Sequence, residues 1–297
     1  MTAAPEFRAR VSMTHIGTAT SILSIDGVNF ITDPMFLEAG THSQGDLGFP
    51  PLTVDRGPAL TLEQLPHIDC VLLSHEDHID NLDDQGRILL NGRHVLTTMD
   101  GAKNLAPRPS VQGKEAWEST TLRLQGKDFK FTWTPAVHLP GGECTGFMIE
   151  YEGFGTAPDG RPNTIWFSGD TVYHDGLKTL GDKFNIVGAI VNLGEAKVPA
   201  ALLEMLPEAV RPNLPEGGSL AITMGGKDCA DFIRDAQPAK VIPLHFAEWK
   251  HFTQFEKELR ATLEDEGVID RFQWLEPAVE TVIFCGSEID PKAHVQD

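Results

Sequence analysis

Basic residues are scarce in this chain. Its 297 residues include 24 lysines and arginines against 43 aspartates and glutamates, a formal net charge of −19 with histidine neutral. A charge of this sign repels the phosphates of nucleic acids and the headgroups of anionic lipids. The composition therefore disfavours DNA, RNA and anionic membranes as partners and favours a small-molecule substrate.

The sequence also lacks a long apolar run and closely spaced cysteines. No stretch approaches the roughly 20 apolar residues of a membrane-spanning helix, and residues 1–10 hold no apolar segment of the kind that marks a secretory signal. The scattered cysteines predict neither a cysteine-based zinc site nor a redox motif. We therefore expect a protein of the reducing cytosol. The cysteines are Cys70, Cys144, Cys229 and Cys285.

Apolar strand segments alternate with helical patterns along the chain. The turn signal Asp26-Gly27 joins residues 21–25 and 28–32 into a predicted hairpin. The hairpin and residues 129–151 indicate antiparallel pairing, whereas helices separate other strands, which predicts two packed sheets with helices outside. We expect a single domain spanning residues 1–297. The other strand segments are 70–74, 94–98, 164–168, 186–191, 240–244 and 281–284.

Two further segments carry apolar residues outside these strands. Residues 35–60 show no regular period, and loops of this length often act as lids. Their apolar side chains either cover a substrate or fold back on the core. A last helix is predicted around residues 252–263, with one apolar face. The loop residues are Phe36, Leu37, Phe49 and Leu52, and the helix residues are Phe252, Phe255, Leu259 and Leu263.

A polar run follows the apolar segment 70–74. It contains His75 and His78 together with the acids Glu76, Asp77 and Asp80. Imidazole and carboxylate groups are the ligands that hold zinc and similar divalent ions. The two histidines are three positions apart, so a tight turn would let both reach one ion. The run therefore predicts a candidate metal site at a strand end.

Three more strand segments end at a histidine or an aspartate. His138 follows the segment 129–134, Asp170 follows 164–168 and His245 follows 240–244. Each alone is compatible with a structural role. Strand ends commonly deliver side chains to one cleft, so the repetition predicts that these residues meet the His75 run in space.

These motifs, in this order, resemble the metallo-β-lactamase superfamily. The similarity covers about residues 10–285 and is strongest to the subgroup of ascorbate-phosphate lactonases and N-acylphosphatidylethanolamine-hydrolysing phospholipases. It implies an α/β fold of four αββα layers, one or two zinc ions (with manganese or iron as alternatives) and hydrolase activity. The motifs are His-x-x-His-x-Asp, Pro-Ala-Val-His138, Phe-Ser-Gly-Asp170 and Ile-Pro-Leu-His245.

The first motif departs from the family pattern His-x-His-x-Asp-His, and two alignments are open. In the preferred one, Glu76 or Asp77 is an insertion and Asn81 stands in place of the final histidine. The resemblance then implies that His75, His78 and His138 hold the first ion, whereas Asp80, Asp170 and His245 hold the second. In the other alignment, Asp77-His78 is the Asp-His pair and Leu73 replaces the first histidine.

The resemblance implies metal-assisted hydrolysis. A bound divalent ion lowers the pKa of its water from about 16 toward about 7, and Asp80, or Asp77 in the other alignment, accepts the proton. A small lactone, lactam, ester or amide is the expected substrate. Phosphodiesterase or phospholipase activity and iron-dependent oxidation on the same fold are the alternatives. His174 and His251 are candidate proton donors or supporting groups, and Glu195 is a candidate substrate contact.

Overall fold

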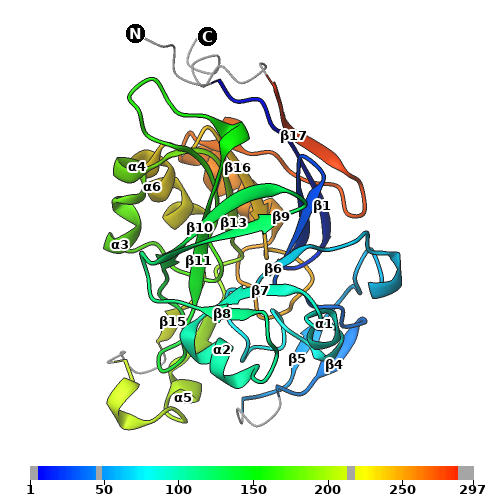
Figure 1. Ribbon diagram of the computed structural model, residues 1–297. Coiled ribbons are helices and arrows are strands. Elements are labelled where there is room, and N and C mark those ends of the chain that lie inside the picture. The colour runs from blue at the N-terminus through cyan, green and yellow to red at the C-terminus, as the bar shows by residue number, and fades with distance from the viewer. Residues whose placement is uncertain (1–5, 45–48, 213–217, 287–297) are drawn as a thin grey trace.

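Two β-sheets pack face to face in the computed structural model, which describes residues 6–44, 49–212 and 218–286 (Figure 1). The first sheet has the strand order β17-β1-β2-β3-β6-β7-β8 and the second has the order β16-β13-β12-β11-β10-β9. The first sheet comprises β1 (Arg10–Gly17), β2 (Thr20–Ile25), β3 (Val28–Thr32), β6 (Cys70–Leu72), β7 (His94–Thr97), β8 (Val111–Gly113) and β17 (Thr281–Cys285). The second comprises β9 (Ser119–Leu124), β10 (Lys127–Pro135), β11 (Thr145–Tyr151), β12 (Asn163–Phe167), β13 (Asn185–Asn192) and β16 (Lys240–Leu244).

The core between the sheets is rich in aromatic side chains. Phe30 from β3 meets Phe129 and Phe131 from β10, with ring centroids 5.1 and 5.7 Å apart in edge-on contacts. Such contacts add to the stabilisation from apolar burial. The predicted hairpin is confirmed, since Asp26 and Gly27 have φ values of 48° and 83° between β2 and β3. Positive φ at both positions matches the tight turn that this pair of residues favours.

Helices cover the outer face of each sheet. Leu89, at the end of α1, belongs to an apolar cluster with Ile31 and Val71 of the first sheet. Phe232 of α6 packs on Trp166 of the second sheet, with ring centroids 4.6 Å apart. The expected four-layer αββα arrangement is therefore confirmed. The helices are α1 (Asp84–Leu89), α2 (Met99–Asn104), α3 (Asp175–Lys178), α4 (Leu180–Lys183), α5 (Ala200–Leu203), α6 (Gly226–Ala236) and α7 (Glu256–Asp265).

The last helix differs from its prediction. It spans Glu256–Asp265, so Leu259 and Leu263 form its buried face, whereas Phe255 is the N-cap and is 41% exposed. Phe252 lies before the helix and is buried in another apolar cluster. The spacing of the two phenylalanines therefore reflects a loop rather than a helical face.

The long segment after β3 partly folds onto the core. Met35 and Phe36 are buried, whereas Leu37 and Leu52 pack at the edge of an apolar cluster around Trp249. Residues 45–48 of this segment lie outside the described residues. Two short ribbons also flank this region: β4 (Gly40–His42) pairs with β5 (Leu52–Val54), and β14 (Lys197–Pro199) pairs with β15 (Ser219–Ala221).

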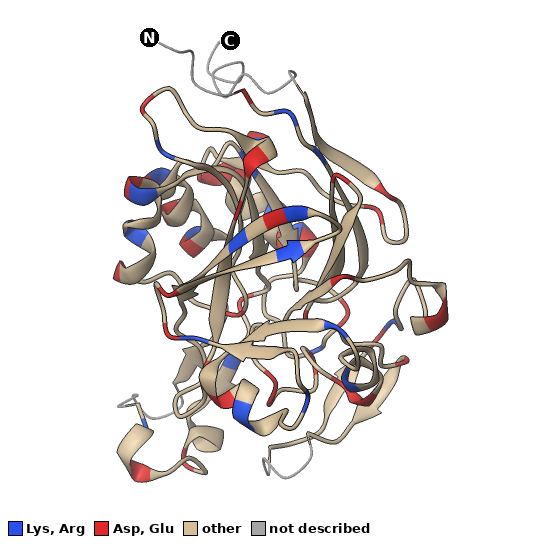
Figure 2. Cartoon of the chain, in the orientation of Figure 1, with Lys and Arg blue, Asp and Glu red and all other residues tan. Residues whose placement is uncertain are grey.

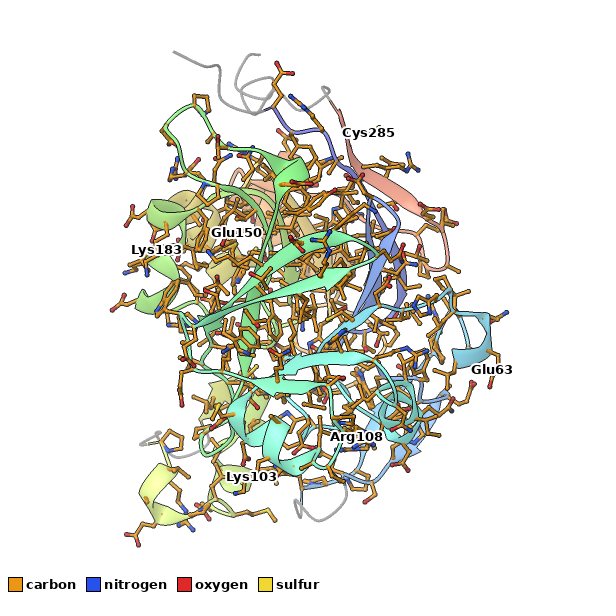
Figure 3. All side chains as sticks on the ribbon, viewed as in Figure 1. Glu63, Lys103, Arg108, Glu150, Lys183 and Cys285 are labelled. Carbon is orange, nitrogen blue, oxygen red and sulfur yellow. The ribbon has the colours of Figure 1, made fainter. Side chains whose placement is uncertain are left out.

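Charged residues of both signs occur along the helices, the loops and some of the strands (Figure 2). Of the charged side chains labelled in Figure 3, Glu63, Lys103 and Lys183 lie at the periphery, while side chains fill the space between the sheets. Within the described ranges, no helix is both long and apolar enough to cross a membrane. All four cysteines are free thiols.

The sheet topology gathers the predicted site residues at one edge. β3 and β6 are parallel in the first sheet, and β12, β13 and β16 are parallel in the second. β10 runs the same way as β12, because both are antiparallel to β11 between them. The carboxyl ends of parallel strands share an edge of the sheet. The residues that follow these strands therefore face a common site.

Candidate metal centre

Three histidine side chains converge at this edge. His75 follows β6, His78 lies in the next turn and His138 follows β10. The distance from His78 Nδ1 is 3.0 Å to His75 Nε2 and 3.1 Å to His138 Nε2. The backbone N–H of Leu82 donates to the carbonyl of His78 at 3.0 Å, which closes the turn. The turn fixes the chain after His78, and the two histidines three positions apart meet at the same point.

Hydrogen bonds on the far side of two rings assign their protons. His138 Nδ1 lies 2.6 Å from the carbonyl oxygen of Ile222, an acceptor, so this nitrogen carries the hydrogen. His75 Nδ1 lies 2.9 Å from Ser74 Oγ, whose own hydroxyl donates to Asp33 Oδ2 at 2.8 Å. We assign the hydrogen of His75 to Nδ1 on this basis. The Nε2 atoms of both rings therefore present lone pairs to the cluster.

This donor set fits a cation. At most one proton, on His78 Nδ1, is available between three converging nitrogens, so at least two lone pairs would face each other without an ion. Tetrahedral zinc with bonds of about 2.0–2.1 Å places its nitrogen ligands about 3.3 Å apart, close to the spacing seen here. Burial lowers the pKa of His75 and that of His138, which favours the neutral imidazole that metals bind.

Asp33 anchors the loop that carries these histidines. Its Oδ1 accepts the backbone N–H of Ser74 at 2.6 Å, and its Oδ2 accepts the Ser74 hydroxyl and the amide of Asn81, the latter at 3.0 Å. Burial, together with the nearby Asp170, raises the pKa of the Asp33 carboxyl to about 7. The carboxyl group thus links the end of β3 to the His75 loop and fixes the Ser74–His75 pair.

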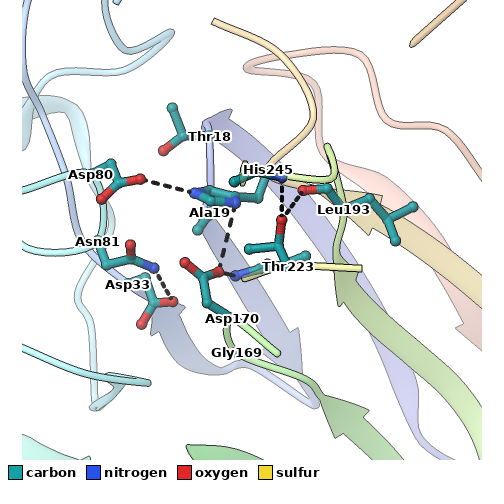
Figure 4. Close-up of polar contacts among 12 residues, drawn as sticks. Thr18, Ala19, Asp33, Asp80, Asn81, Gly169, Asp170, Leu193, Thr223 and His245 are labelled. Atoms are coloured by element: carbon teal, nitrogen blue, oxygen red, sulfur yellow. Dashed lines mark hydrogen bonds and ion pairs between the residues drawn. The ribbon is translucent and has the colours of Figure 1, made fainter. Parts of the chain in front are cut away.

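A second group of donors consists of Asp80, Asp170 and His245, which face one another in Figure 4. Asp80 Oδ2 is 3.4 Å from His245 Nε2, and Asp170 Oδ1 is 3.6 Å from His245 Nδ1. Asp170 Oδ2 is also 4.0 Å from His138 Nε2, so this carboxylate lies between the two groups. Neither ring nitrogen of His245 has a hydrogen-bond partner among the described residues, although the side chain is buried. Buried nitrogens without partners are expected where an ion binds.

The charges in this second group support one another. Burial lowers the pKa of His245, but the Asp170 and Asp80 carboxylates outweigh it and raise the value to about 9. Burial opposes ionisation of Asp80, yet the neighbouring His245 and His251 hold the pKa of its carboxyl well below the usual range. Asp80 is therefore an anion at neutral pH. This anion is positioned to attract a cation or to accept a proton.

Several candidate residues lie outside the cluster. Glu76 turns away and pairs with Arg87 at 2.9 Å, whereas Asp77 is exposed. Leu73, which the second alignment places at the first histidine position, is buried in an apolar cluster under the first sheet. His174 and Glu195, the two remaining candidates, interact with residues outside the cluster. His174 caps α3 by accepting the Gly176 N–H, and Glu195 pairs with Lys197 at 3.0 Å.

Two contacts of Asp170 were missed by the sequence reasoning. Asn192 ends β13 and donates its side-chain amide to Asp170 Oδ1 at 2.7 Å. A polar residue at the end of a buried strand, the pattern used for the other site residues, was an available signal. Cys144 lies with Sγ 3.0 Å from the Asp170 carbonyl oxygen, and burial raises the pKa of this thiol well above its usual value. No spacing signal marks Cys144.

A cavity of about 150 Å³ opens beside the histidines. His78, Asp80 and His251 line its polar side, and most of its other lining residues are apolar. Besides the histidines, the described lining contains one basic residue, Lys197, which forms an ion pair with Glu195. The apolar lining residues are Phe49, Pro50, Leu52, Leu139, Val198, Pro199, Leu202 and Ile222.

Gly169 sets the direction of Asp170, and its replacement by alanine should destabilise the protein. Its φ is +58°, and a Cβ there would lie 2.4 Å from the Thr145 carbonyl oxygen and 2.6 Å from Ser74 Cβ. We expect Gly169→Ala to lower the free energy of unfolding by more than about 2 kcal/mol, measured by urea denaturation. The matched control is Gly27→Ala, which also has positive φ but no atom within 4 Å. Its expected cost is about 1 kcal/mol, and equal losses for the two variants would contradict the steric argument.

The fold and this cluster together define a metal-binding hydrolase. Two packed sheets under outer helices carry a cluster of histidines at one strand edge, with carboxylates beside it. Residues 29–246 match the family model described as the beta-lactamase superfamily domain. The chain belongs to the metallo-β-lactamase superfamily and is a metal-dependent hydrolase.

Curated relatives and solved structures agree with this placement. A UPF0173 metal-dependent hydrolase from Anaeromyxobacter is 25% identical over 222 residues, covering 70% of this chain and 69% of the relative. Another, from Methanopyrus kandleri, is 22% identical and covers 89% of this chain and 96% of the relative. The structures of a possible metal-dependent hydrolase from Veillonella parvula and of an isothiocyanate hydrolase from Delia radicum gut bacteria share the fold. Both are 18% identical to this chain. The Veillonella structure has a TM-score of 0.69 and covers 92% of this chain and 100% of its own. The isothiocyanate hydrolase has a TM-score of 0.68 and covers 91% of this chain and 98% of its own.

Proposed function

We propose that this enzyme hydrolyses a small ester, lactone, lactam or amide with one or two zinc ions. His75, His78 and His138 would hold the first ion, and Asp80, Asp170 and His245 the second. The observation that carries this proposal is the convergence of three imidazoles beside a mostly apolar cavity, with His75 Nε2 and His138 Nε2 within 3.1 Å of His78 Nδ1. It favours the first alignment of the motif, because Asp77 and Leu73 are directed elsewhere.

A bound divalent ion would supply Lewis acidity and make water a nucleophile near neutral pH. The residues of this chain would position and deprotonate the reactants. Asp80 lines the cavity as an anion, so it can accept the proton of the attacking water and pass it to the leaving group. Ile222 and Ser74 fix the rings of His138 and His75 from behind, which holds both nitrogens in place through the reaction.

The lining of the cavity supports a small, weakly charged substrate. Its volume is about 150 Å³, below the roughly 300 Å³ at which pockets for drug-sized ligands begin. The nearby Lys197 is paired with Glu195 at 3.0 Å, so the described lining offers a phosphodiester no unpaired lysine or arginine beside the proposed ions. An ester or amide therefore fits better than a phospholipid or a nucleic acid.

The four free thiols support the expected cytosolic location.

Metal removal and replacement would test this proposal. Protein treated with a chelator should lose hydrolysis of a panel of lactones, lactams, aryl esters and isothiocyanates, and added zinc should restore it. Elemental analysis should give one or two ions per chain. Full activity of the metal-free protein would contradict the proposal. Iron in the purified protein with substrate-dependent oxygen consumption would instead support the oxidase alternative, and cleavage of phosphodiesters alone would support the phospholipase alternative.

A further inference from the structure

The second donor group lacks one imidazole. Asn81 stands where the motif is expected to supply a histidine, and its amide nitrogen is already committed to Asp33 Oδ2 at 3.0 Å. Only its Oδ1 remains, buried and without a hydrogen-bond partner within the described ranges. An amide oxygen is a weaker zinc ligand than an imidazole nitrogen. Asn81 alone would therefore leave the second ion weakly held.

His251 faces the same carboxylate oxygen of Asp80 as His245 does. Its Nε2 is 3.6 Å from Asp80 Oδ2, the same oxygen that lies 3.4 Å from His245 Nε2. The distance of 3.6 Å is too long for a hydrogen bond. One carboxylate oxygen thus faces two imidazole nitrogens, and neither contact is a hydrogen bond of ordinary geometry.

Aromatic packing rather than hydrogen bonding positions the His251 ring. Phe252 packs against both His251 and His245, with a centroid distance of 4.7 Å in each case. The Trp249 ring also lies near His251, with a centroid distance of 5.9 Å. His251 Nδ1 is buried with no hydrogen-bond partner in the described part of the chain, and the side chain is 22% exposed toward the cavity. The ring is therefore held in place while both nitrogens remain available.

We infer that His251 provides the imidazole that Asn81 does not, so that Asp80, Asp170, His245 and His251 form the second metal site. This inference rests on the proposed metal centre. The replacing histidine comes from the loop between β16 and α7. His245 directly follows β16, and His251 lies further along this loop. The chain thus supplies the second imidazole of this donor set from a different segment of sequence.

Metal stoichiometry tests the inference independently of catalysis. Zinc content after dialysis, and binding affinity by calorimetry, should show two ions in the unmodified protein. His251→Ala should retain the first ion and bind the second at least about tenfold more weakly. His174→Ala is the matched control, because this histidine caps α3 outside the cluster, and it should keep both ions. Thermal unfolding of each variant checks that the fold persists.

A double variant separates ligation from a supporting role. Asn81→His added to His251→Ala should restore the second ion, because the histidine then returns at the motif position. Cobalt-loaded protein should show the same pattern in its visible absorption. Tight binding of two ions by His251→Ala would overturn the inference, as would a single ion in the unmodified protein, yet both leave the proposed hydrolase intact. A protein that binds no metal would instead refute the proposed function itself.

Discussion

Replacing His138 by alanine should remove the first ion and reduce kcat/KM by at least about 100-fold. The variant deletes one of three converging nitrogens and leaves the Ile222 carbonyl without its 2.6 Å donor. Two imidazoles alone give a weaker site, because zinc is held in enzymes by three protein ligands. Elemental analysis after dialysis and hydrolysis of the most active substrate in the panel would measure both effects.

The control for this variant is His67→Ala. His67 is on the surface, where its side chain is 76% exposed and faces Asp69 at 3.4 Å. Replacing it should leave metal content and kcat/KM unchanged. If His138→Ala keeps its full metal content while its unfolding temperature stays normal, the proposed first ion site is wrong.

Replacing Asp80 by asparagine should reduce kcat by about 10²–10⁴-fold. The change preserves shape but removes the anion that faces His245 and His251 at 3.4 and 3.6 Å. It would lose both the proton acceptor and one charged donor to the second ion. Pre-steady-state and steady-state kinetics on zinc-loaded protein would show whether the loss is in kcat, as expected, rather than in KM.

Asp77→Asn distinguishes the two motif alignments. Asp77 is exposed and three residues from Asp80 in the chain, so the first alignment predicts little change in kcat for this variant. The second alignment predicts the opposite ranking, with Asp77 essential and Asp80 dispensable. Unchanged kcat in Asp80→Asn together with a large loss in Asp77→Asn would therefore reject the proton acceptor proposed here.

Much of the fold could be predicted from local sequence, because buried strands and tight turns have local signatures. The hairpin around Asp26-Gly27 and the apolar strands before His75 and Asp170 are examples. Strand β1 was missed because its polar residues find distant partners: the Ser12 hydroxyl donates to Glu280 Oε1 at 2.7 Å, 268 positions away. The last helix was extended too far, since Phe252 and Phe255 repeat at a helical spacing by chance.

The candidate site could be predicted at strand ends but less well in loops. His138, Asp170 and His245 follow strands whose direction fixes where the side chains arrive. His251 follows no strand, and only the path of the loop after β16 brings it to Asp80. The outward turn of Glu76 toward Arg87 likewise depends on a residue 11 positions away. Such arrangements require tertiary structure and cannot be read from spacing.

The donor atoms come from both sheets, which gives an ion bound there a mechanical role. His75 and Asp80 follow a strand of the first sheet, whereas Asp170 and His245 follow strands of the second. A cation bound by residues from both sheets would link the two sheets at this edge, and the link would be lost when the cation dissociates. Stability would then increase with free metal as RT ln(1 + [L]/Kd). Slow sliding or splaying of one sheet against the other would be suppressed in the loaded protein, so resistance to proteolysis would rise with metal supply.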